Sequence, residues 1–368
     1  MTDTPLLSWK QALAWRMERH HLVARRKPRD LLRVVGDVCG LHAQLTSSAE
    51  LSLWARIDGL KCDALHEALW ERRTLVKLWA TRGTLHVLPS AELGVWIAAL
   101  GTYTNRGMTG HPEIDGLSEA IGRALDGRVL SREELAREVE RRTGSQTLGE
   151  WVRFSWGSYM KPASFRGRLC FAPSDDNRVR FTSTATWVPG GLDLPDSAEA
   201  LREVTRRYLT AYAPATAEDL ALWWGVGPAR GRRMLAALGD EAVEVDVDGH
   251  CAWMLARDVR AMDRAKARHT ARLLPAFDPW VAGASRNTPA LLDPQHKSRV
   301  LRPQGWISPV LLVNGRMVGI WRHERKGRRL RVELEPFGRL PAWARTELDA
   351  ETERLASFLG DELERRWV

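Results

Sequence analysis

The feature that most constrains the fold of this chain is a pattern of two helices followed by a β-hairpin, which recurs along the sequence. Two helices are predicted to begin at matching capping sequences, Ser131 with Glu134 and Thr216 with Asp219. A first, less regular copy precedes them. The strand pairs of the three copies are predicted at 75–81 and 84–88, 169–171 and 179–182, and 243–247 and 252–255. Helix, turn, helix and hairpin is the winged-helix order, so the repetition indicates three such units.

We therefore predict a helix-rich α+β fold of tandem winged-helix units, each a helix-turn-helix plus a β-hairpin. The predicted boundaries are 1–115 for the first unit, 116–195 for the second, 196–265 for the third and 266–368 for a C-terminal α/β region.

The C-terminal region is predicted to differ from the repeats because its strands are longer. Asn314-Gly315 stands between the apolar runs 310–313 and 316–321, which is a strong hairpin signal. A second hairpin with a basic tip is predicted across 322–331, and a final helix across 347–366.

Composition limits the classes of partner. The formal net charge of +9 favours a polyanionic partner, although charge alone does not identify one. The four cysteines are scattered and form no metal-ligand or disulfide pattern, so we expect no metal and no cofactor. No apolar run reaches membrane-spanning length, and Met1 to Pro5 does not begin a signal peptide. We expect a cytoplasmic protein with no membrane partner, and a monomer as the simplest state.

Clustered arginines mark the surfaces where DNA contact is predicted. One lies at the tip of the first hairpin, three lie on the second helix of the third unit, and others form the basic C-terminal tip. A solvated charged face is the alternative in each case. The candidate DNA-binding residues are Arg82, Arg230, Arg232, Arg233, Arg325, Lys326 and Arg328.

The candidate catalytic residues are His42 and Gln44, which flank Ala43 in an otherwise apolar segment. A helix over 30–39 is predicted to end at Gly40, and an extended His-x-Gln would then place both polar side chains on one side, with Ala43 turned inward. Ser47 or Ser48 is expected to cap the next helix. An imidazole and an amide aimed at one point can hold and orient a water molecule. Local sequence alone favours the alternative, in which His42 packs against the core and Gln44 caps a turn.

Five stretches of the sequence resemble the winged-helix DNA glycosylase superfamily typified by AlkZ and YcaQ. These stretches are 40–44, 47–56, 79–86, 274–280 and 309–322. The resemblance implies three tandem winged helices in a C-shaped arrangement around duplex DNA. The catalytic signature of the superfamily, Gln-x-Gln in AlkZ-like members and Gln-x-Asp in YcaQ-like members, falls on His42-Ala43-Gln44. Gln44 matches the AlkZ-like pattern, and His42 departs from it.

The resemblance implies a monofunctional DNA glycosylase that acts without metal or cofactor. Its substrate would be double-stranded DNA with N7-alkylated purines, bulky or crosslinked, in DNA repair or in self-resistance to a genotoxin. The alternative is a winged-helix DNA-binding or regulatory protein without catalysis. The two functions differ at the site, because a catalytic protein should present both His42 and Gln44 to an open basic surface.

Overall fold

The computed structural model describes residues 4–103, 112–154, 157–175, 178–188, 190–283 and 288–368. Met1 to Asp3, part of the N-terminal segment considered above, lie outside the described residues. The chain divides into two compact units: unit 1 is 1–64, 205–223 and 227–368, and unit 2 is 65–204 and 224–226. Among the described helices, none combines the length and the apolar character that crossing a bilayer requires.

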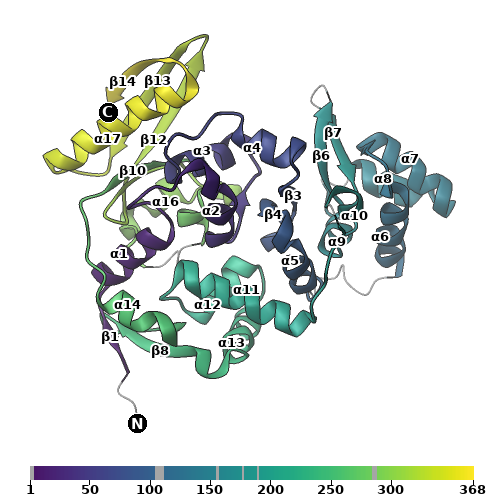
Figure 1. Ribbon diagram of the computed structural model, residues 1–368, viewed down its shortest axis with the longest axis horizontal. Coiled ribbons are helices and arrows are strands. Elements are labelled where there is room, and N and C mark those ends of the chain that lie inside the picture. Colours follow the sequence, from purple (N-terminus) through teal and green to yellow (C-terminus); the bar gives the residue numbers. More distant parts are fainter. Residues whose placement is uncertain (1–3, 104–111, 155–156, 176–177, 189, 284–287) are drawn as a thin grey trace. The chain divides into compact units, whose positions relative to one another are not determined.

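The largest sheet of unit 1 has five strands, in the order β10-β11-β12-β13-β14 (Figure 1). The first three pairings are antiparallel and the last is parallel. Asn314 and Gly315 both have positive φ, 48° and 83°, as a tight hairpin between β11 and β12 requires, so the prediction of this hairpin is confirmed. The strands are β10 (Ala271–Leu274), β11 (Val310–Val313), β12 (Arg316–Lys326), β13 (Arg329–Pro336) and β14 (Glu362–Trp367).

The helix α17 (Ala342–Leu359) packs on this sheet, with Leu348 and Leu355 in the same buried apolar cluster as β11. The prediction of a final helix over 347–366 is wrong at both ends. Gly360 adopts a left-handed conformation (φ 71°) and ends the helix, and the following residues pair in parallel with β13 as β14.

Unit 1 also contains a second, smaller sheet and several helices. The second sheet has the order β1-β8-β9. It follows α12 and α13, so a helix pair and a hairpin succeed each other as predicted, and Thr216 and Asp219 cap each other reciprocally. The elements are β1 (Leu6–Leu7), α1 (Trp9–Arg19), α2 (Leu31–Asp37), β2 (Leu41–His42), α3 (Thr46–Arg56), α12 (Ala217–Trp224, whose last residue belongs to unit 2), α13 (Pro228–Ala236), β8 (Ala242–Val247), β9 (His250–Leu255), α14 (Val259–Asp263), α15 (Pro279–Gly283) and α16 (Lys297–Val300).

Unit 2 repeats the same succession of a capped helix, a second helix and a strand pair. Ser131 caps α7 and forms the predicted capping box with Glu134, and β6 and β7 pair antiparallel. The elements are α4 (Ala64–His66), β3 (Leu75–Trp79), β4 (Leu85–Pro89), α5 (Leu93–Leu100), α6 (Pro112–Leu125), β5 (Leu130–Ser131), α7 (Arg132–Thr143), α8 (Gln146–Phe154), α9 (Lys161–Phe165), β6 (Cys170–Asp175), β7 (Arg178–Thr182) and α10 (Thr184–Trp187). The helix α11 (Ser197–Tyr212) begins in unit 2 and ends in unit 1.

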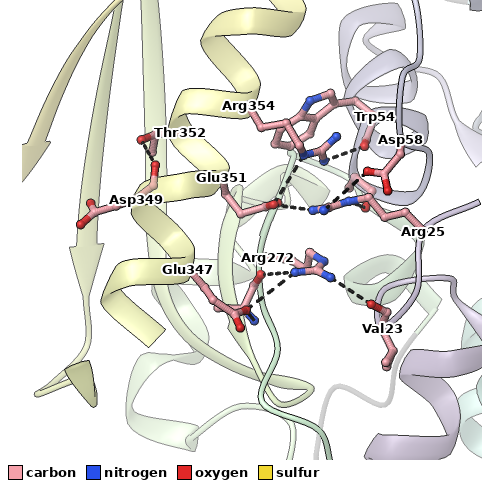
Figure 2. A network of polar contacts seen from close by, with 12 residues as sticks. Val23, Arg25, Trp54, Asp58, Arg272, Glu347, Asp349, Glu351, Thr352 and Arg354 are labelled. Atoms are coloured by element: carbon pink, nitrogen blue, oxygen red, sulfur yellow. Dashed lines mark hydrogen bonds and ion pairs between the residues drawn. The ribbon is translucent and has the colours of Figure 1, made fainter. Parts of the chain in front are cut away.

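A buried ionic network joins α17 to the end of α3 within unit 1 (Figure 2). Glu351 is 4% exposed, and its carboxylate accepts a hydrogen bond from Arg25 and lies 3.5 Å from Nε of Arg354. Arg354 in turn donates to the carbonyl of Trp54 (2.8 Å) and lies over the Trp54 ring. Burial lowers the pKa of Arg354 to about 10. The network therefore fixes the C-terminal end of α3, the helix that follows the candidate catalytic residues.

Candidate active site

His42 and Gln44 differ in burial although only Ala43 separates them. His42 is 8% exposed, and its ring stacks on Phe277 with a centroid distance of 4.7 Å and an interplanar angle of 8°. Ala43 is fully buried, which confirms that it turns inward, and Gln44 is exposed. The stacking covers one face of the largely buried imidazole, whereas Gln44 is exposed to solvent.

A turn between α2 and β2 positions this segment. The helix α2 ends at Asp37, and Cys39 and Gly40 then take positive φ values of 61° and 90°. Their backbone N–H groups donate to the carbonyls of Gly36 and Val35 at 2.9 and 2.8 Å. The predicted stop at Gly40 is therefore a two-residue turn, in which glycine meets the left-handed conformation without steric cost.

The helix after the motif begins earlier than predicted. Its N-cap is Leu45 and its first residue is Thr46, so the prediction that Ser47 or Ser48 caps it is wrong. Both serines lie inside the first turn of α3. The carbonyl of Leu45 accepts the N–H of Ser48 at 3.1 Å, but its apolar side chain cannot accept an N–H of the first turn. The N-terminus of α3 thus follows directly after the exposed Gln44.

A fully buried ion pair lies next to Phe277, the residue whose ring stacks on His42. Arg56, the last residue of α3, donates two hydrogen bonds of 2.7 Å to the carboxylate of Asp278, and both side chains are 0% exposed. Oδ1 of Asp278 also accepts the N–H of Trp280 (2.9 Å). Phe277, which precedes Asp278, has a φ of 58°. The helix that starts beside Gln44 is thereby bonded, at its other end, to Asp278, the residue that follows Phe277.

A second buried histidine, His20, packs against the tyrosine that is hydrogen-bonded to the residue before the Cys39–Gly40 turn. Tyr212 donates to the carbonyl of Val38 (2.9 Å), the residue before the turn, and His20 packs edge-on against the Tyr212 ring. Burial lowers the pKa of His20 well below its usual value, and the nearby guanidinium groups of Arg56 and Arg16 lower it further. His20 is therefore a neutral structural group.

Reasoning from the sequence missed Phe277, Asp278 and Arg56 as site residues. A signal was present, because Arg56 ends an apolar helix and Asp278 interrupts an apolar run, and a buried charge needs a partner. The pairing itself, across 222 positions, could not be read from the sequence. Trp306 was also missed: it is exposed and contacts the edge of the Phe277 ring at a centroid distance of 5.0 Å.

Comparison with known proteins places this geometry in a family. A family model described as DNA glycosylase AlkZ-like matches residues 35–358. A Streptomyces sahachiroi protein named interstrand DNA cross-link repair glycosylase is 34% identical over 328 residues, which cover 85% of this chain and 87% of that protein. The solved structure of the Streptomyces sahachiroi DNA glycosylase AlkZ matches with a TM-score of 0.87 and 33% identity, over 98% of this chain and 99% of that chain.

This chain belongs to the AlkZ-like DNA glycosylase family. The resemblance inferred from the sequence is confirmed, as are the helix-rich α+β fold class and the enzyme class, a DNA glycosylase. The matched region includes His42 and Gln44. Their roles in this family member stay a prediction.

Among the predicted DNA-binding residues, Arg82 lies at a hairpin tip that packs within unit 2. Arg82 has a φ of 58°, and its N–H donates to Oη of the buried Tyr103 at 3.2 Å. Gly225, with a φ of 91°, lies so close that an added Cβ would come within 2.8 Å of Cα of Arg82. The Arg82 side chain is half-buried, so its backbone anchors the tip and only part of its side chain faces solvent.

The other predicted DNA-binding residues lie in unit 1 as two separate groups. On α13, Arg232 and Arg233 are exposed and Arg230 is half-buried, and Arg232 forms a 3.0 Å ion pair with Glu218. At the tip between β12 and β13, Arg325 binds Asp361 at 2.7 Å and Lys326 lies 3.2 Å from Glu324. Arg328 is exposed at the same tip. The acidic partners reduce the net charge of each group, and contact with DNA stays a prediction for all of these residues.

Proposed function

We propose that this AlkZ-like glycosylase hydrolyses the N-glycosidic bond of N7-alkylated purines in duplex DNA. The observation that carries the proposal is the exposed Gln44 beside an anchored His42, inside a chain that belongs to a glycosylase family. Alkylation at N7 makes the purine cationic, so it can leave without being protonated. The enzyme then has to stabilise an oxocarbenium-like sugar and present water to C1′, which needs positioning more than a strong acid.

In this proposal Gln44 holds the water through its amide, and neutral His42 accepts the proton of the water or fixes its lone pair. A protonated His42 would lie close to the positive sugar and would oppose its formation. The stacking on Phe277 keeps the imidazole plane fixed. The start of α3, directly after Gln44, adds backbone N–H groups that favour a phosphate of the damaged strand.

We base the proposed substrate range on a relative of this chain. The Streptomyces sahachiroi relative is named an interstrand DNA cross-link repair glycosylase. By that likeness, we propose bulky or crosslinked adducts as substrates, in repair or self-resistance. The same proposal includes the tandem winged helices with their predicted boundaries and a C-shaped arrangement around DNA. It also includes DNA contacts of the seven basic residues, a monomeric state and a cytoplasmic location.

The test is base release from a duplex that carries a single N7-methylguanine, and from the same duplex with an N7–N7 interstrand crosslink. Release is scored as strand cleavage at the resulting abasic site under mild alkali. We expect cleavage that depends on the enzyme in both duplexes, and none in undamaged DNA.

The burial of His42 is the observation that favours the rival function, a DNA-binding protein without catalysis. A wild-type protein that binds both damaged duplexes and releases no base from either would establish that rival and would refute the glycosidic function proposed for this site.

A further inference from the structure

Next to the His42–Phe277 stack lies a solvent-exposed tryptophan that none of the catalytic steps above uses. Trp306 is 42% exposed, and within the parts of the chain that the structure describes it is the one exposed tryptophan. Burying an indole normally stabilises a fold, so an exposed one on a structured surface is unusual. Its ring contacts the edge of Phe277 at 5.0 Å, and Phe277 stacks on His42 at 4.7 Å. The two contacts place the indole within about 10 Å of the imidazole.

The loop that carries Trp306 is closed and anchored. Leu301 and Ile307 form an antiparallel bridge across it, and the N–H of Arg302 donates to the carbonyl of Trp306 at 2.9 Å. Gln304 and Gly305 have positive φ values of 59° and 77°, which make the tight turn. Ile307, the next residue, is buried. The backbone that carries the indole is therefore fixed before any ligand binds, which reduces the entropy lost on binding.

A surface hollow of about 150 Å³ adjoins the same indole. Its apolar lining comes from Trp306, Pro309, Ile320 and Trp321. Trp321 is held rigidly, because its Nε1 donates to the carbonyl of Leu274 at 2.8 Å. The hollow is open to solvent and has polar as well as apolar lining, and its volume is sufficient for one aromatic ring.

The charged rim of the hollow is compatible with a cationic base. Two arginines and two glutamates line it: Arg302, Arg322, Glu333 and Glu335. Glu333 is paired with Arg322, and Glu335 with Arg299, so the rim carries no large positive excess that would repel a cation. The electron-rich faces of indoles also attract cations. An N7-alkylated purine combines a positive charge with an apolar substituent, which matches both properties.

We propose that Trp306 and the adjoining hollow bind the substituent of the alkylated purine and so select for aromatic or apolar adducts over a methyl group. This inference rests on the proposed function, since it names the substrate class of the same site. Trp306 contacts the adduct and contributes binding, while His42 and Gln44 act at the sugar.

The test compares two duplexes that differ only at one base, N7-methylguanine or N7-benzylguanine, in single-turnover release by the full-length protein. Trp306→Ala should slow release of the benzylated base about tenfold and change release of the methylated base by less than about twofold. Trp306→Phe should keep most of the rate on the benzylated base, because it keeps a ring. Phe154→Ala, which removes another exposed aromatic residue, should leave both rates unchanged.

A second variant tests the hollow without altering Trp306. Ile320→Trp should fill the hollow and slow release of the benzylated base selectively. Equal losses on both substrates in these variants would mean that Trp306 only supports Phe277, and would overturn the inference, as would unchanged rates on both. If the wild type releases neither base, the proposed function fails together with it. A wild type that releases both bases, with no selective loss in the variants, leaves the proposed function intact and refutes the inference alone.

Discussion

Replacing Asp278 with asparagine tests whether the buried ion pair holds the catalytic segment in place. The change keeps the size of the side chain and removes its charge, so the guanidinium of Arg56 stays buried with one good acceptor instead of a carboxylate. Both side chains are 0% exposed and share two hydrogen bonds of 2.7 Å. Removing one partner of such a pair typically costs about 3–5 kcal/mol. Because the amide oxygen can still accept one bond, we expect a loss near the lower end, about 3 kcal/mol.

The assay is thermal unfolding followed by circular dichroism, with base release from N7-methylguanine DNA measured on the same samples. For a unit of this size, a loss of about 3 kcal/mol corresponds to a fall in Tm of about 10 °C. We also expect slower release at 25 °C, because Phe277 and the His42 ring lose their fixed geometry. Glu364→Gln is the matched control: it makes the same carboxylate-to-amide change in the exposed pair with Arg331, where the cost should stay below about 1 kcal/mol.

The double variant Arg56→Met, Asp278→Leu distinguishes the effect of the ion pair on stability from its effect on the position of Phe277. Replacing both charges with apolar groups of similar size removes the uncompensated charge, so it should recover much of the stability lost in Asp278→Asn. It should not recover activity, because the hydrogen bond from the Trp280 N–H and the position of Phe277 depend on the Asp278 carboxylate. A melting temperature for Asp278→Asn within about 2 °C of wild type would refute the reasoning.

Three further predictions concern ionisation and the α17 contact. Since the folded-state pKa of His20 lies below its unfolded value, neutral His20 contributes stability above about pH 6.5 that is lost as the pH falls further. His20→Gln should therefore unfold with a weaker dependence on pH between about 6.5 and 5 than wild type, and parallel curves would contradict this assignment. Glu351→Gln, which leaves Arg25 and Arg354 without their buried carboxylate, should lower the free energy of unfolding by about 3 kcal/mol in denaturant titrations; no change would show that the network in Figure 2 is not stabilising. The single-turnover rate of wild type should fall on acidification, because protonated His42 cannot accept the proton of the water, whereas His42→Gln, which restores the Gln-x-Gln pattern, should give a flat profile wherever circular dichroism shows both proteins folded.

Elements that depend on neighbouring residues were predictable from the sequence. Ser131 with Glu134, and Thr216 with Asp219, mark helix starts because the capping bonds span only three residues. Asn314-Gly315 marks its hairpin because few other pairs accept positive φ at both positions. Ala43 is buried as predicted, but His42 beside it is buried as well, so burial does not alternate along this segment.

Features that depend on distant partners were not predictable. The residues of β14 are charged and helix-compatible, and only their pairing with β13 makes them a strand. The start of α3 at Thr46 also went against a local signal, since Ser47 and Ser48 are better N-cap residues than Leu45.

The candidate site was predicted in part. The motif and the exposure of Gln44 could be found from the sequence, and the family resemblance gave the chemistry. Local sequence favoured packing of His42 against the core, but its partner could not be found, because the ring of Phe277 lies more than two hundred residues away in the chain. The basic tip was likewise visible in the sequence, whereas the partner of Arg325, Asp361, became visible only in the fold.

The most direct test of the central claim is the single-turnover release of N7-methylguanine from duplex DNA by wild type, Gln44→Ala and His42→Ala, with the DNA affinity of each protein measured in parallel. If Gln44 and His42 hold the water that attacks C1′, both variants should lose at least about a hundredfold in rate and should bind the duplex with unchanged affinity. Variants that release the base as fast as wild type would contradict the account and would place the water elsewhere in the protein.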